Sequence, residues 1–306
     1  MLMVPKIDLS VGLAGLSLQN PTVLASGIWG TNANLLLRAE KSGAGAVTSK
    51  SCSLNPRAGH ANPTIVLNDH YCVNAVGLSN PGVELEAEEI ISAKKMCSVP
   101  VIASIFAHSL QDFEAVAQRI SEARPDAIEV NISCPNVSNE GRMFACSAAD
   151  SASVTVRVKE AAGKIPILVK LSPNVTDIVS VAKSVEDAGA DGIVAINTVS
   201  GMIIDAYARK PVLTNKFGGV SGPAIKPVAL KAVYEISRAV RIPIIGTGGV
   251  TTGIDAAEML MAGAAAVGVG TALSYPGRSF GAIVSELESF MSENGYSSIK
   301  QLKLDE

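Results

Sequence analysis

Eight short apolar runs recur along the chain, and longer stretches with the spacing of amphipathic helices separate them. The runs occupy residues 22–25, 46–49, 101–105, 127–132, 167–170, 192–196, 244–246 and 265–269. Most are unbroken and rich in Val, Ile and Ala, as in parallel strands that are buried on both faces. Because parallel neighbours need a crossover connection, the helical stretches between the runs fit the same arrangement.

The entries into these runs are also alike. Three follow a glycine suited to the left-handed cap of the preceding helix and three follow a proline that ends it: Gly43, Gly189, Gly263, Pro100, Pro166 and Pro243. Eight such units of about 25 residues predict an α/β fold of the (β/α)8 or TIM-barrel class, in one domain over residues 1–306. A doubly wound open sheet is the alternative, although no Gly-x-Gly-x-x-Gly follows the first run.

Two intervals are longer than the others, residues 50–100 and residues 197 to about 230. Both follow predicted strands, so both belong to the C-terminal face of the barrel, where barrel enzymes carry their active sites. We therefore expect functional insertions on that face, and no separate domains.

Composition excludes several classes of protein. With 17% charged residues and a net charge of −3, the chain has no basic surface for nucleic acid. Its five cysteines lack disulfide, zinc or iron–sulfur spacing, so no metal site is expected. The longest uncharged stretch, residues 259–276, falls short of the roughly 20 apolar residues that a membrane span needs. Without a secretory pattern at the N-terminus, a cytoplasmic location is expected.

Polar residues and glycines stand just past the C-terminal end of every predicted strand. They are Ser26, Lys50, Ser104, Asn131, Cys134, Lys170, Asn197, Thr198, Gly248, Gly249, Gly270 and Thr271. Lys50 and Lys170 directly continue apolar strands, and a lysine in a barrel mouth indicates an anionic ligand unless it extends to solvent. The glycines after the last two strands allow a phosphate to approach the backbone closely. A phosphorylated cofactor or substrate is therefore expected.

Cys134 lies just past a strand, in a loop on the predicted catalytic face. This placement favours a base or nucleophile over a buried small hydrophobe. The three histidines form no recognisable dyad with it, so a thiol of ordinary pKa, ~8.5, would give activity that rises toward alkaline pH. The turn-rich segment 74–78 displays an amide side chain at Asn74, which by itself is also ordinary turn chemistry.

Several motifs together resemble the class 1 dihydroorotate dehydrogenases, in order and nearly end to end. They are Ala25-Ser-Gly27, Ser49-Lys50, Asn74-Ala-Val-Gly-Leu78, Asn131-Ile-Ser-Cys-Pro-Asn136, Lys170-Leu-Ser-Pro173, Asn197-Thr198 and Gly246-Thr-Gly-Gly-Val250. Within the class, segments 201–205, 209–213 and 218–227 resemble the B-type catalytic subunit.

The resemblance implies FMN-dependent oxidation of (S)-dihydroorotate to orotate in pyrimidine (UMP) biosynthesis, within one FMN-binding barrel. Cys134 would be the general base, while a hydride leaves the substrate for flavin N5. The substrate would be held by Lys50, Asn74, Ala75, Val76, Gly77, Leu78, Asn131, Asn197 and Thr198. The cofactor would be held by Ser26, Lys50, Ser51, Ser104, Asn131, Lys170, Ile196, Gly222, Gly248, Gly249, Gly270 and Thr271.

The B-type resemblance also implies a partner protein. In B-type enzymes the catalytic subunit passes its electrons to a second subunit, which passes them on to NAD. A homodimeric core would join a second subunit that carries FAD and a [2Fe–2S] cluster, giving a heterotetramer. The chain departs from the B-type pattern in two places. Relatives usually have Asn where Ser104 stands, and a glycine-rich stretch is replaced around residues 138–146.

Three alternative functions remain open. The chain could be an A-type homodimer that uses fumarate, or a related pyrimidine-reducing flavoenzyme. It could be a flavin-binding barrel without catalysis. It could also be a phosphosugar isomerase on the same barrel, which would lack flavin colour.

Overall fold

The computed structural model describes residues 7–133 and 144–305, and within them the eight predicted parallel strands form one sheet. These strands are β3 Thr22–Leu24, β4 Val47–Thr48, β7 Val101–Ile105, β8 Ala127–Asn131, β9 Ile167–Leu171, β10 Gly192–Ala195, β15 Ile244–Thr247 and β16 Ala266–Val269. Each strand end lies within one residue of its predicted position, and β7 has the predicted bounds. The three expected cap glycines have φ of 94° to 108°, in the left-handed region that an L residue rarely adopts.

The sheet closes into a barrel. Its strand order is β3-β16-β15-β10-β9-β8-β7-β4, and a parallel bridge between Val23 and Ala46 joins the two ends. The Leu24 N–H donates to the Ala46 carbonyl at 2.9 Å across this seam. Closure confirms the (β/α)8 prediction and excludes the doubly wound sheet, which would leave two edges open.

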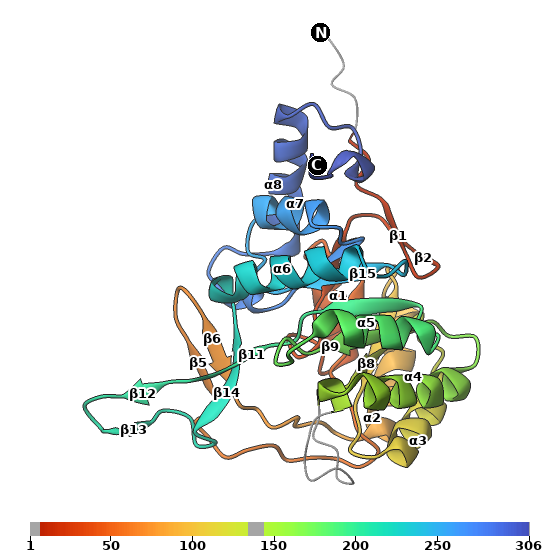
Figure 1. Ribbon diagram of the computed structural model, residues 1–306, viewed down its shortest axis with the longest axis vertical. Coiled ribbons are helices and arrows are strands. Elements are labelled where there is room, and N and C mark those ends of the chain that lie inside the picture. The colour runs from red at the N-terminus through yellow and green to blue at the C-terminus, as the bar shows by residue number, and fades with distance from the viewer. Residues whose placement is uncertain (1–6, 134–143, 306) are drawn as a thin grey trace.

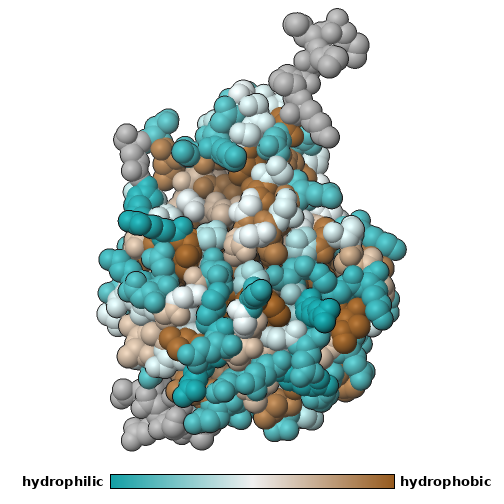
Figure 2. Space-filling view, turned by 90° about the vertical axis from the view of Figure 1, so that its right-hand side faces the viewer, coloured by the Kyte–Doolittle hydropathy of each residue, from teal (hydrophilic) through white to brown (hydrophobic). Residues whose placement is uncertain are grey.

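Helices surround the barrel (Figure 1). They are α1 Ala33–Lys41, α2 Val83–Met96, α3 Leu110–Ser121, α4 Ala148–Ala162, α5 Ile178–Asp187, α6 Lys226–Ser237, α7 Gly253–Met261 and α8 Phe280–Glu293. Short 3-10 helices occur at η1 Phe144–Cys146, η2 Pro223–Ile225, η3 Thr271–Ser274 and η4 Ile299–Gln301. The face in Figure 2 is largely hydrophilic, with hydrophobic residues in small separate groups. No helix in residues 7–133 or 144–305 is long and apolar enough to cross a membrane.

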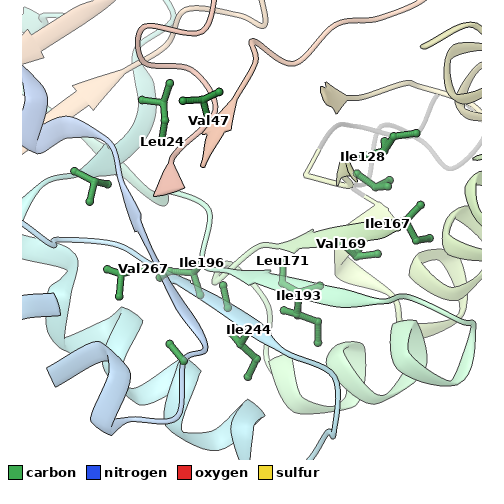
Figure 3. Close-up of a cluster of buried hydrophobic side chains, with 14 of the residues drawn as sticks. Leu24, Val47, Ile128, Ile167, Val169, Leu171, Ile193, Ile196, Ile244 and Val267 are labelled. Carbon is green, nitrogen blue, oxygen red and sulfur yellow. The ribbon is translucent and has the colours of Figure 1, made fainter. Parts of the chain in front are cut away.

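Alternate residues of each barrel strand point outward or inward. The outward ones, among them Ile167, Val169 and Leu171, pack against the helices in the main core (Figure 3). The inward residues near the N-terminal strand ends are also apolar, as Ile102 and Leu168 are. Toward the C-terminal ends the inward residues become polar. The barrel interior therefore changes from an apolar base to a polar mouth, and the site lies at that mouth.

An N-terminal hairpin, which the sequence analysis did not predict, closes the base of the barrel. Its strands are β1 Val11–Leu13 and β2 Leu16–Leu18, paired antiparallel. Leu13 and Leu18 are each 1% exposed and pack against the apolar inward side chains. The hairpin lies at the opposite end of the barrel from the long insertions (Figure 1).

The two long insertions form a second sheet over the mouth. Strands β5 Ile65–Leu67 and β6 Cys72–Asn74 come from the first insertion, and β11 Val199–Met202 and β14 Phe217–Ser221 from the second. The order β11-β14-β6-β5 places the two insertions side by side through antiparallel pairing of β14 with β6. A small hairpin, β12 Ile204–Asp205 with β13 Lys210–Pro211, projects beyond it (Figure 1). The insertions are thus on the predicted face, but Asn74 ends a strand and does not belong to a free loop.

Candidate active site

A cavity of about 680 Å³ lies between the barrel mouth and the second sheet. Its volume is within the usual range for small-molecule and cofactor sites. Most residues expected to bind cofactor or substrate line it. They are Ser26, Lys50, Ser51, Asn74, Ala75, Val76, Gly77, Leu78, Asn131, Lys170, Ile196, Asn197, Thr198, Gly222, Gly248, Gly249, Gly270 and Thr271. The structure thus brings together strand ends that are up to about 250 positions apart in the sequence.

One expected site residue within the described part of the chain, Ser104, does not line the cavity. Ser104 is fully buried behind the wall, where its hydroxyl contacts Ser51 and Glu129. Cys134 lies outside the residues that the structure describes.

The second sheet supplies one wall of the cavity through close backbone contacts. In the pairing of β6 with β14, Asn74 lies opposite Gly219, and the Asn74 amide donates to the Gly219 carbonyl at 3.4 Å. A Cβ at Gly219 would collide with the Thr198 side chain, and one at Gly218 would collide with the Asn74 carbonyl. These glycines let the sheet approach the strand ends that carry the polar side chains.

The two lysines reach the cavity from different strands. Lys170, on β9, is 6% exposed and its Nζ donates to the Ser26 hydroxyl at 2.9 Å. Its ammonium also lies 3.8 Å from the Glu129 carboxylate. Lys50 follows β4, and its backbone N–H donates to the Gly30 carbonyl at 2.8 Å. Both side chains border the same cavity, as expected for a site that takes an anion.

Amide side chains from β8 and β10 meet at the centre of the mouth. The Asn197 amide donates to Asn131 Oδ1 at 3.3 Å and to Ser133 Oγ at 3.0 Å. Asn197 Oδ1 accepts from the Thr198 N–H at 2.8 Å, and the Thr198 carbonyl accepts from Asn174 at 2.9 Å. Mutual hydrogen bonds hold these amides in place, so the site is organised in advance for a planar polar ligand.

Glycine backbones border the cavity beside β15 and β16. Gly248 and Gly249 have φ of +134° and +76°, so side-chain-bearing residues would be strained there. A Cβ at Gly249 would also meet the backbone of Lys226. Near them the Thr271 hydroxyl donates to Ser221 Oγ at 2.8 Å. Glycine backbone beside a cavity suits a phosphate group that must approach N–H donors closely, because no side chain stands in the way.

The residues present fit an FMN group. The Thr247 hydroxyl is buried at the cavity wall and has no hydrogen-bond partner among the described residues. Buried polar atoms without a partner are rare, and a bound polar ligand is one usual reason for them. Lys170 adds a cation, the segment 248–249 adds a glycine cradle, and Ser26 adds a hydroxyl. The site therefore offers the ring, hydroxyl and phosphate contacts that a flavin mononucleotide needs.

Sequence reasoning missed several wall residues, and Glu129 is the most consequential residue that it missed near the site. Glu129 is 3% exposed and lies on β8, where it accepts from two serine hydroxyls. One signal was available, because this glutamate stands in the middle of a mostly apolar strand, on the same inward face as Ala127 and Asn131. His60, which borders the cavity beside Gly77, gave no comparable signal because its loop has no strand pattern.

Comparisons with known proteins agree with this geometry. The family model described as dihydroorotate dehydrogenase matches residues 8–291. Three relatives carry the name dihydroorotate dehydrogenase B (NAD(+)), catalytic subunit. That of Pyrococcus abyssi is 44% identical over 96% of this chain and 97% of its own. That of Geobacter sulfurreducens is 42% identical over 97% of both chains, and that of Methanocaldococcus jannaschii is 46% identical over 93% of this chain and 94% of its own. By the extent of these matches, the chain belongs to the dihydroorotate dehydrogenase family.

Proposed function

We propose that this protein is the FMN-dependent catalytic subunit of an NAD-linked dihydroorotate dehydrogenase, with one FMN-binding barrel domain over residues 1–306. It oxidises (S)-dihydroorotate to orotate in pyrimidine biosynthesis. The observation that carries the proposal is a single cavity bordered by two lysines, an amide cluster and a glycine cradle. The names of full-length relatives at 42–46% identity support the same reaction.

The chain's own residues divide the work between substrate and cofactor. Asn74, Asn131, Asn197 and Thr198 hold the pyrimidine ring through amide and hydroxyl hydrogen bonds, with the backbone of residues 75–78 beside them. Lys50 pairs with the substrate carboxylate and also borders the cofactor. These contacts orient the substrate, and orientation is a large part of catalysis for a bound reactant.

Bound FMN supplies the two-electron acceptor that takes a hydride from the substrate. Lys170 would lie by the ring, where its positive charge would favour the reduced, more negative form. Ser26, Ser51 and Ile196 would hold the ring, and the phosphate would be held by Gly222, Gly248, Gly249, Gly270 and Thr271. All of these residues border the cavity. Second-sheet residues cover the mouth and limit the access of water.

Cys134 removes the proton from carbon 5 of the substrate in this proposal. A thiolate is the reactive form, so the step needs a deprotonated cysteine and becomes faster toward alkaline pH. The motif in which Cys134 stands supports this role.

A partner protein completes the electron path. The relatives are named as catalytic subunits of NAD(+)-linked enzymes, which supports a separate electron-transfer subunit. We propose that this subunit carries FAD and a [2Fe–2S] cluster and joins a homodimer of this chain in a heterotetramer.

The visible spectrum of the purified protein tests the proposal directly. A yellow protein that loses its flavin absorption when dihydroorotate is added supports it, and a colourless protein that does not take up FMN contradicts it. An acceptor screen then separates the B type from the A type. Fumarate-supported turnover without a partner would favour an A-type homodimer, and full-rate NAD reduction by the isolated chain would contradict the two-subunit arrangement.

A further inference from the structure

Glu129 places a carboxylate inside the barrel, below the cavity. Its side chain points inward from β8, and its residue is 3% exposed. The Ser26 hydroxyl donates to Oε1 at 2.6 Å and the Ser104 hydroxyl donates to the same oxygen at 2.7 Å. The second oxygen, Oε2, lies 3.8 Å from the Lys170 ammonium. A carboxylate this deep is stable only when it is paired and hydrogen-bonded, and this one is both.

The protons in this network have a defined direction. An ionised carboxylate only accepts, so the single protons of Ser26 and Ser104 are committed to Glu129. Ser26 must then accept from Lys170, at 2.9 Å. Ser51 and Ser104 lie 2.8 Å apart, and because the Ser104 proton is committed, Ser51 is the donor in that pair.

This direction affects the cavity itself. Ser26 and Ser51 both border it. The Ser26 proton points toward Glu129 and the Ser51 proton toward Ser104, so both point away from the cavity. The two serines can therefore offer only acceptor lone pairs to a bound group. At the same time the Glu129 charge balances that of Lys170, which would otherwise be an uncompensated cation in a buried site.

We propose that Glu129 is a positioning residue of the cofactor site: it holds Lys170 in place, balances its charge and orients the hydroxyls of Ser26 and Ser51. This inference rests on the proposed function, because Lys170 is assigned there to the flavin. It extends that function by identifying the residue that balances the positive charge assigned to the flavin ring. Glu129 acts through Lys170 and the serines, without a place in the cavity wall.

The first experiment needs no cofactor. Urea unfolding of the apoprotein is compared for wild type, Glu129→Gln, the double variant Glu129→Gln/Lys170→Met, and the control Thr48→Val. Thr48 is 2% exposed on β4 and lies outside the cavity wall. Glu129→Gln leaves Lys170 unpaired, so its unfolding equilibrium constant should be about a hundredfold higher than that of wild type. Removing both charges in the double variant should bring the constant most of the way back to the wild-type value. The proposal is overturned if Glu129→Gln matches the Thr48 control, or if the double variant is no more stable than Glu129→Gln.

The second experiment measures the affinity of the apoprotein for oxidised and for reduced FMN. In Glu129→Gln the uncompensated Lys170 should favour the more negative reduced ring, so the ratio of the two dissociation constants should shift about tenfold. That is a rise of about 30 mV in midpoint potential for a two-electron couple. Glu129→Asp keeps the charge and should stay closer to wild type. An unchanged or lowered potential in Glu129→Gln, or equal shifts in the Gln and Asp variants, would refute the electrostatic role.

The two experiments separate this inference from the proposed function. If the protein takes up no FMN, the proposed function fails, while apoprotein unfolding still decides whether Glu129 and Lys170 are coupled. If FMN binds and is reduced by dihydroorotate but the potential does not respond to Glu129→Gln, the function stands and the positioning role fails.

Discussion

Glu86 is a buried carboxyl group on the first turn of α2, close to Ser49 and Lys50 at the edge of the site. Its residue is 1% exposed, and neither carboxylate oxygen has a hydrogen-bond partner among the described residues. Burial raises its pKa to about 7, against the lowering effects of Ser49 and the Lys50 charge. The folded protein therefore holds a proton there that the unfolded chain releases near pH 4.5.

The stability of the protein should consequently fall as pH rises from 4.5 to 7. In that interval the folded state binds more protons than the unfolded state, so the free energy of unfolding decreases, in total by about 3 kcal/mol for this group. Glu86→Gln should remove this component and make the variant more stable than wild type above pH 7. Urea unfolding at several pH values measures it. Glu88→Gln, an exposed change on the same helix, should leave the pH dependence as in wild type.

A second prediction at the residue scale concerns the proposed general base and its replacement in Cys134→Ser. A serine hydroxyl is a far weaker base than a thiolate near neutral pH, and general bases contribute roughly 10²–10⁴-fold to rate. Turnover with dihydroorotate should fall by about that factor while the protein stays yellow. Wild-type turnover should rise toward alkaline pH, and steady-state assays across pH measure both effects. Unchanged turnover in the variant would rule out Cys134 as the base.

At the scale of elements, two parts outside the eight repeats complete the barrel. The hairpin β1–β2 closes the apolar base with Leu13 and Leu18, and the second sheet roofs the polar mouth. The N-terminal end of the barrel is thereby closed by apolar packing, and the C-terminal end holds the ligand cavity.

Shortening a buried side chain of the β1–β2 hairpin should therefore destabilise the whole barrel. Leu13→Ala removes a side chain that is 1% exposed, and such changes lower the free energy of unfolding by about 2–5 kcal/mol. The same substitution at Leu85, which is 54% exposed on α2, should change it by less than about 0.5 kcal/mol. Chemical denaturation of the two variants measures the difference. Equal, small effects would show that the hairpin does not contribute to the barrel core.

At the scale of the whole molecule, the site joins segments from both insertions and from the ends of all the barrel strands except β7. A ligand that contacts so many elements binds only the folded state. It should therefore raise the free energy of unfolding, by about 2.7 kcal/mol when its concentration is a hundred times its dissociation constant.

FMN should accordingly raise the thermal midpoint of the apoprotein, and riboflavin should do so less. Riboflavin has the same ring system but no phosphate, so it cannot use the backbone at Gly248 and Gly249 that borders the cavity. Calorimetry at matched ligand concentrations measures the two shifts. Equal shifts for FMN and riboflavin would contradict a phosphate site at these glycines.

The sequence by itself determined the eight strands, the cap glycines and which residues stand at the strand ends. These follow from short-range rules, because strand burial, helix caps and crossovers leave local patterns. The family motifs also identified nearly the whole rim in advance, although Ser104 proved to lie behind the wall.

Only the tertiary structure decided how distant segments meet. It showed that the two insertions pair through β6 and β14, that a hairpin closes the base, and that Glu129 joins Ser26 to Lys170. Strand pairing between residues about 145 positions apart, such as Asn74 and Gly219, depends on register across the barrel mouth, which no local pattern contains. The direction of a buried hydrogen-bond network likewise depends on which side chains share one interior, and the closed barrel alone sets that.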